Sequence, residues 1–164
     1  MVERAMHAAT IATAIGAGLT AGIFLAFSCF IMAALGRIEP RSGIAAMQAI
    51  NVAVINPLFM LVFMGTGVVA IGLAAGALAG WSGGQGMLLL AASGLYVVGC
   101  VGVTMALNVP LNNALAAVAA DSDAGAELWA RYLRDWTFWN HVRTLASLAA
   151  SILFVVVLTR ASAA

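Results

Sequence analysis

Most polar side chains that lie outside the predicted loops fall into three short stretches of the chain. Each stretch borders an apolar run, and polar groups within a bilayer are costly, typically by a few kcal/mol for a charged group near its centre. Their grouping at one depth therefore predicts a shared cavity or interface. The stretches are Gln48, Asn51 and Asn56; Asn108, Asn112 and Asn113 around Pro110; and Trp136, Asn140, His141 and Arg143.

The segment 129–144 carries the greatest variety of chemical groups. As a helix it places Trp136, Asn140 and Arg143 on one face, with Trp139 also adjacent to Arg143. Arg143 lies inside the apolar run, where an unpaired guanidinium is costly, so it indicates a site. An aromatic belt at the membrane surface accounts for the neighbouring Trp129, Arg131 and Tyr132.

His141 stands beside Arg143 with no second histidine, cysteine or carboxylate at metal-ligand spacing. This isolation argues against a zinc or haem site, and we expect no metal. A neutral imidazole can act as a general base, and the neighbouring cation would favour that neutral form while stabilising a substrate anion. A structural histidine is the alternative interpretation.

The spacing of Asn108 and Asn112 places both amides on one helix face. Pro110 lies between them, and a proline frees backbone carbonyls in the preceding turn. The amides then either satisfy those carbonyls or donate hydrogen bonds to a ligand oxygen in a pocket. In the first apolar run, the side chains of Phe24, Phe27, Ser28 and Phe30 either pack together or line an aromatic cavity.

The elements that position these residues follow from composition. The 164 residues are 64% hydrophobic and 8% charged, and lysine is absent. Four apolar segments, roughly 6–35, 56–79, 85–107 and 137–159, each suffice to cross a hydrocarbon core of about 30 Å. Because lipid offers the backbone no hydrogen-bond partners, they must be helical. The sequence predicts an all-α fold, one transmembrane domain over 1–164 built as a four-helix bundle.

Two short extra helices are predicted at one end of this bundle. The turn at Gly80–Gly84 joins the second and third spans as a hairpin, and Pro110 is expected to interrupt the third. The uncharged stretch from Arg41 to Asp121 is too long for two spans alone. We therefore expect short helices over 42–55, broken near Asn56, and over 111–120.

Composition also limits the partners. A net charge of +1 with scattered arginines excludes nucleic acid as a ligand. The expected partners are a lipid bilayer and a hydrophobic small-molecule substrate, and the expected location is the bacterial inner membrane. Glycines at helix-packing spacing, Gly18/Gly22 and Gly72/Gly76/Gly80, serve packing within the chain or form the contact of a homo-oligomer. Cys29 and Cys100 are expected to be small buried apolar side chains.

Several of these stretches together resemble the anthrone oxygenase family of small membrane proteins. The resemblance extends over nearly the whole chain. It implies a four-helix membrane fold and a monooxygenase that oxidises an anthrone to an anthraquinone with O₂, without metal or flavin. The stretches that carry it are Phe27-Ser28-Cys29-Phe30, Met47-Gln48-Ala49-Ile50-Asn51, Asn108-Val109-Pro110-Leu111-Asn112-Asn113, and Trp136 with Trp139-Asn140-His141-Val142-Arg143-Thr144.

Such a reaction needs a base, donors to a developing oxyanion and flat apolar walls. From residue chemistry we assign His141 as the base and Trp136 and Trp139 as walls. The expected oxyanion donors are Arg143, Asn108, Asn112 and Asn140, and the expected further substrate contacts are Asn51, Gln48, Ser28 and Phe27. The same residues would serve a non-enzymatic membrane protein that binds or transports a small hydrophobic molecule, or a subunit that assembles into a larger membrane complex.

Overall fold

The computed structural model describes residues 1–82 and 84–161, and these residues form helices and turns with no strand among them. The chain order is α1 (Val2–Ala26), η1 (Phe27–Ile31), α2 (Met32–Leu35), α3 (Pro40–Ala53), α4 (Pro57–Leu78), α5 (Gly86–Gly94), η2 (Leu95–Gly102), η3 (Thr104–Asn108), α6 (Val109–Ala116) and α7 (Asp123–Ala161). The elements named η are π-helical turns, which continue the α-helices on either side of them.

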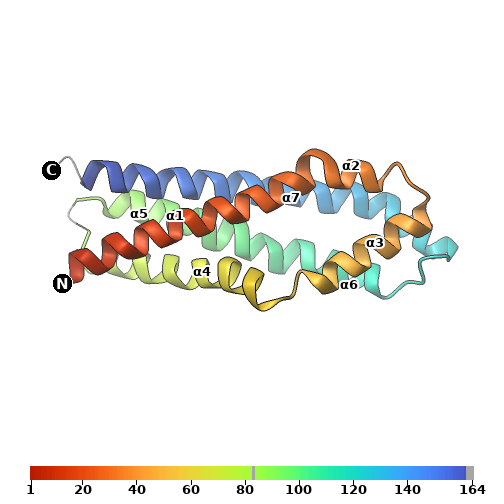
Figure 1. Cartoon of the computed structure of the whole chain (residues 1–164), viewed down its shortest axis with the longest axis horizontal. Coiled ribbons are helices and arrows are strands. Elements are labelled where there is room, and N and C mark those ends of the chain that lie inside the picture. Colours follow the sequence, from red (N-terminus) through yellow and green to blue (C-terminus); the bar gives the residue numbers. More distant parts are fainter. Residues whose placement is uncertain (83, 162–164) are drawn as a thin grey trace.

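Four continuous helices are long and apolar enough to cross a membrane: Val2–Leu35, Pro57–Leu78, Gly86–Ala116 and Asp123–Arg160. The all-α four-helix membrane fold predicted from composition is therefore confirmed. α4 has 22 residues and is about 33 Å long, close to the hydrocarbon thickness. The other three are longer and extend beyond α4 at the end that carries α2, α3 and α6, opposite the two termini (Figure 1).

The third span differs from the prediction because Pro110 does not interrupt it. The helix continues through Pro110 to Ala116, so 111–116 is an extension of the span instead of a separate helix, and 117–120 form turns. A proline normally clashes with the carbonyl four residues before it. Here the π-helical turn η3 changes the hydrogen-bond register just ahead, and Pro110 falls in the first turn of α6. The short helix before α4 does form, as α3.

Asn56 explains why α4 begins where it does. Its side-chain oxygen accepts a hydrogen bond from the backbone nitrogen of Phe59 at 3.0 Å, and Pro57 follows as the first helical residue. This is an N-cap followed by a proline whose missing N–H needs no partner. Asn56 is thus a structural residue that fixes the junction between α3 and α4.

The core has two parts. One lies among the transmembrane helices and includes Phe63, Tyr96 and Phe154. The other lies in the extension, where Trp129 and Tyr132 stack at 5.6 Å and both are buried. The aromatic-belt interpretation of these two residues is wrong, because α3 and α6 pack against this part of α7 and cover them.

Close packing between α1 and α4 depends on a glycine outside the predicted spacing. A Cβ atom at Gly16 would overlap the Thr66 side chain, whereas Gly22 and Gly72 face open space. Gly76 does pack closely, against Met6 of α1. The glycine pairs are therefore only partly explained by contacts within the chain, and a homo-oligomer stays a prediction.

Candidate functional site

A cavity of about 300 Å³ lies where the junction of α3 and α4 meets the other transmembrane helices. Its size falls at the lower end of the range for small-molecule sites, and its walls are mostly apolar. The aromatic and methionine side chains on its walls are Phe24, Phe27, Phe59, Phe63, Trp136, Met47, Met60, Met64 and Met105. The polar groups that reach it are Asn51, Thr104, Asn112, Arg143 and the indole of Trp136.

Arg143 is the distinctive feature of this cavity. Its side chain is only 4% exposed, and its guanidinium lies over the ring of Phe24 at 4.2 Å and that of Trp136 at 5.0 Å. Among the residues that the structure describes, no carboxylate pairs with it. It donates one hydrogen bond to Thr104 Oγ1 at 3.3 Å and one to Asn140 Oδ1 at 2.8 Å.

These two bonds use two of the five N–H groups of a guanidinium, and the buried Nε has no partner among the described residues. A buried cation without a counter-charge is costly in an apolar surrounding. An anion in the cavity would relieve that cost and bond the remaining N–H groups. The electrostatics of the site therefore favour a ligand that is anionic or becomes anionic there.

Asn140 holds Arg143 in place from behind. Its amide nitrogen donates to Phe24 O and to Ser28 Oγ, both at 2.8 Å, while its oxygen accepts from Arg143. Asn140 is fully buried and does not line the cavity, and Ser28 does not line it either. In this geometry both residues position the arginine and tie α7 to the first helix, without reaching a ligand themselves.

Asn112 is held by two donors on α7. Its side-chain oxygen accepts from Tyr132 Oη and from Trp136 Nε1, each at 2.8 Å. These bonds fix which end of the amide is the acceptor, and its nitrogen makes no hydrogen bond to a described residue. Since Asn112 lines the cavity, that nitrogen is available as a donor to a ligand. Asn51 joins this network through a long contact of 3.5 Å to Tyr132 Oη.

Two π-helical turns supply parts of the site. η1 carries Phe27 and Ser28, and η3 carries Thr104 and Met105. π-helical turns are rare and recur at functional sites because they change the direction of the side chains that follow. Thr104 was missed from the sequence, although its spacing of four from Asn108 and eight from Asn112 continues one polar helix face.

The structure does not bring His141 or Trp139 to the cavity. His141 is exposed, and Trp139 is half-buried with its ring edge-on to Phe138 at 4.9 Å. Successive helical residues point about 100° apart, so His141 cannot share the inward face of Asn140 and Arg143. The predicted roles of His141 as base and Trp139 as wall lack a geometric basis in this structure.

Gln48 and Asn108 also lie outside the cavity. The Gln48 amide donates to the carbonyls of Leu115 and Val118 at 2.8 and 3.1 Å, which joins α3 to the end of α6. The Asn108 amide donates to Trp136 O at 3.1 Å, and its buried oxygen has no partner among the described residues. Of the predicted site residues, the cavity therefore brings together Phe27, Asn51, Asn112, Trp136 and Arg143.

Comparison with protein families identifies a family to which this chain is similar. The family model described as anthrone oxygenase matches residues 59–153, more than half of the chain. The chain belongs to the anthrone oxygenase family. The match supports a related, oxygenase-like function, and it includes Thr104, Asn112, Trp136 and Arg143 of the cavity. No curated protein and no solved structure matches this anthrone oxygenase family member.

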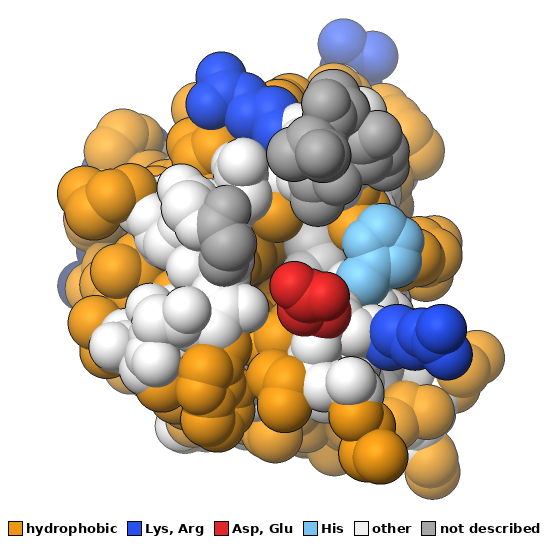
Figure 2. Space-filling view, turned by 90° about the vertical axis from the view of Figure 1, so that its left-hand side faces the viewer, with side chains coloured by type: hydrophobic (Ala, Val, Ile, Leu, Met, Phe, Trp, Pro, Cys, Tyr) orange, Lys and Arg blue, Asp and Glu red, His pale blue; other side chains and the backbone are white. Residues whose placement is uncertain are grey.

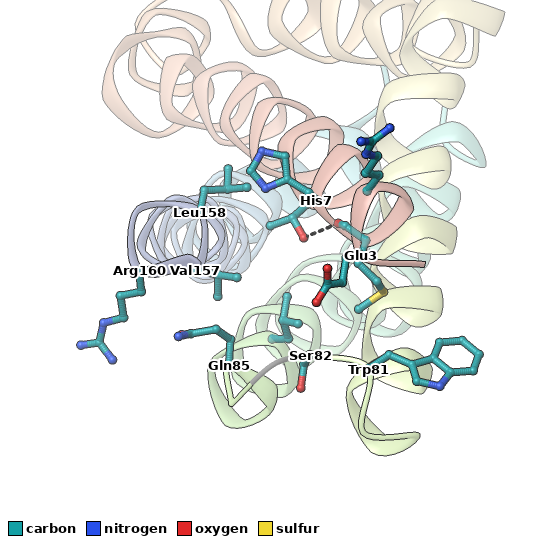
Figure 3. Close-up of a pocket in the computed structure, with 12 residues that line it drawn as sticks. Glu3, His7, Trp81, Ser82, Gln85, Val157, Leu158 and Arg160 are labelled. Carbon is teal, nitrogen blue, oxygen red and sulfur yellow. Dashed lines mark hydrogen bonds between the residues drawn. The ribbon is translucent and has the colours of Figure 1, made fainter. Parts of the chain in front are cut away.

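A second cavity, of about 530 Å³, lies at the other end of this anthrone oxygenase family member, between α1, α5 and α7 (Figure 3). Its walls include Glu3, Arg4 and His7 from α1, and the side chains of Trp81 and Arg160 point away from the space between the helices. Seen from this end, a few charged groups stand among mainly apolar and uncharged side chains (Figure 2). Since most of its lining residues fall outside the matched segment, we take the cavity at Arg143 as the candidate site.

Proposed function

We propose that this protein is a membrane oxygenase that binds an anthrone-like polycyclic aromatic ketone in the cavity at Arg143 and oxidises it with O₂. One observation carries the proposal. Arg143 is a buried guanidinium that reaches an apolar, aromatic-walled cavity and has no carboxylate partner among the described residues. Such a site suits a flat aromatic molecule whose oxygen gains negative charge.

An anthrone fits this requirement chemically. Its CH₂ group lies between two aromatic rings and is conjugated with the carbonyl, so loss of a proton gives a delocalised anion with its charge largely on oxygen. Arg143 and the free N–H of Asn112 can both donate to that oxygen. The apolar walls lower the local dielectric and strengthen this attraction. Arg143 is a cation, and no histidine or carboxylate lines the cavity in the described part of the chain, so we propose that the proton of the enol form leaves to water as the anion forms beside Arg143.

The remaining steps balance without another reductant. The carbanion carbon forms a bond to O₂, and the resulting peroxide takes up a proton. Loss of the second C–H proton, with cleavage of the O–O bond, then gives a carbonyl group and water. In total one anthrone and one O₂ give one anthraquinone and one H₂O, and the four electrons that the carbon loses are those that O₂ gains.

Isotope-labelled oxygen tests this proposal. Purified protein in detergent is given anthrone and ¹⁸O₂, and O₂ uptake and anthraquinone formation are followed against a sample without protein, because anthrone oxidises slowly by itself. We expect a protein-dependent rate, one ¹⁸O atom in each quinone and one O₂ consumed for each quinone formed. Release of H₂O₂ in place of water, or no rate above the protein-free sample, would contradict the proposal.

The absence of a histidine or carboxylate among the described residues that line the cavity also favours a second candidate, a protein that binds a hydrophobic aromatic molecule without converting it. Equilibrium binding of anthraquinone, which is the product of the proposed reaction and is not oxidised further, separates the two. Binding that Arg143→Met abolishes, in a protein that shows no O₂ uptake with anthrone, would support the binding protein and exclude the oxygenase.

A further inference from the structure

One wall of the cavity at Arg143 is also part of the outer surface of the bundle. Ile23, Met64 and Met105 line the cavity, yet their side chains are 38%, 38% and 58% exposed. Met60 shares both properties. These four residues belong to three different membrane-spanning helices, since Ile23 is on α1, Met60 and Met64 are on α4, and Met105 is on η3. We call them the rim; the cavity reaches the outside of the bundle at these positions and, next to the cap of α4, at Ile55, which is 73% exposed.

The position of the rim along α4 gives its depth in the membrane. α4 begins at the exposed, polar cap Asn56 and is only about as long as the hydrocarbon core is thick. Met60 and Met64 follow the cap by one and two turns, about 6 and 12 Å along the axis. The rim therefore opens within the hydrocarbon layer, on the side of α3 and α6, and its apolar side chains face lipid.

We infer that the ligand of this site enters and leaves sideways from the bilayer, through the rim, as the uncharged form of a membrane-dissolved aromatic ketone. The inference rests on the proposed function and adds the substrate class and the route. A charged ligand could not pass through hydrocarbon without a large desolvation cost. A neutral one can, and it ionises only after it reaches Arg143 behind the rim. Aromatic ketones that carry a sugar or a sulfonate are therefore excluded as substrates.

The side chains of the rim suit a passage of this kind. Three of the four are methionines, which are unbranched and flexible and make favourable sulfur contacts with aromatic rings. They can move aside for a flat molecule and close again without leaving a polar group unpaired.

Exchange kinetics in vesicles test the route independently of turnover. The probe is 1,8-dihydroxyanthraquinone, which is uncharged and not oxidised further, and its visible absorption reports binding after vesicles with and without protein are mixed. Narrowing variants are Ile23→Trp and Met64→Trp. Matched controls are Leu19→Trp and Leu61→Trp, which are exposed on the same two helices but do not line the cavity.

We expect the rim variants to slow association and dissociation by the same factor, on the order of tenfold, and to leave Kd unchanged, because a passage affects both directions equally. The controls should exchange like the natural protein. A change in Kd without slower exchange would mean that these residues only shape the cavity, and would overturn the inference. Slow exchange in Val54→Trp, at the turn between α3 and α4, with normal exchange in the rim variants would place the entrance at that turn instead.

A charged probe gives a second, independent measurement. Anthraquinone-2-sulfonate added outside the vesicles should not bind, although its anion would suit Arg143. Rapid binding of this probe would show a route from water and would refute entry through the bilayer. Neither probe is oxidised, so these measurements do not depend on turnover. Slower exchange in the rim variants together with no oxygenase activity would refute the proposed reaction and leave the route of entry standing.

Discussion

Replacement of Arg143 by methionine tests the central feature of the proposed mechanism. Loss of one preorganised donor to an oxyanion lowers kcat by about 10²–10³-fold, or about 2.7–4 kcal/mol. Arg143 has three N–H groups without a partner among the described residues, so we expect Arg143→Met to lose at least this much activity towards anthrone. The measurement is the rate of O₂ uptake in detergent at saturating substrate.

The same variant should lose little stability. The hydrogen bonds of Arg143 to Thr104 and Asn140, which the variant loses, are worth about 1.5–3 kcal/mol each. This loss is offset because the variant no longer buries an unpaired cation, whose desolvation costs roughly several kcal/mol. We therefore expect the Tm to stay close to that of the natural protein. Arg134→Met is the matched control, because Arg134 is exposed and pairs with Asp135 at 2.8 Å. An Arg143→Met protein that retains more than about a tenth of the activity would refute oxyanion stabilisation by this residue.

Substitutions of His141, Asn112 and Gly16, with their control variants, test other parts of the structure. His141→Ala should retain full O₂ uptake, because its side chain is exposed outside the cavity; a large loss would restore it as the base. Asn112→Leu should lower the free energy of unfolding by about 1–3 kcal/mol by leaving two donors unbonded. Asn112→Asp should have a free energy of unfolding close to that of the natural protein but a low rate of O₂ uptake, since a carboxylate repels the ligand oxyanion. An Asn112→Asp protein with both normal stability and normal O₂ uptake would contradict a donor role of Asn112. Gly16→Ala should destabilise by about 1–3 kcal/mol in thermal unfolding and be rescued by Thr66→Ala, whereas Gly22→Ala should not destabilise.

The transmembrane helices could be predicted because their lengths and composition follow directly from the thickness and apolarity of the bilayer. The inward face of α7 could also be predicted from helical spacing. Trp136, Asn140 and Arg143 lie on this face, and the buried Ser147 and Ala150 continue it. The same spacing could have excluded His141, which falls off that face. His141 was assigned as the base because imidazole can accept a proton, although its position on the helix points away from the inward face.

The route of the third helix could not be predicted from its residues alone. A proline normally breaks a helix, whereas here the π-helical turn η3, which packs against α7, precedes Pro110 and the helix continues. Of the cavity wall formed by α3, only Asn51 was predicted from the sequence, because an apolar stretch does not reveal which helix it will cover. Gln48 shows this clearly, since its partners are carbonyls at the end of α6, far away in the chain.

The π-helical turns that carry Phe27, Ser28 and Thr104 have a consequence for how such a site can change. A π-helical turn holds one more residue than the α-helical turn it replaces. Deletion of a single residue from Phe27–Ile31 would return this turn to α-helix. Five residues of a π-helical turn and four residues of an α-helix both sweep roughly 400° about the axis, so the helix on either side would keep nearly the same facing. The change would be confined to the turn itself, where Ser28 contacts Asn140. Chain length within these turns, and not only residue type, is therefore part of what specifies this site.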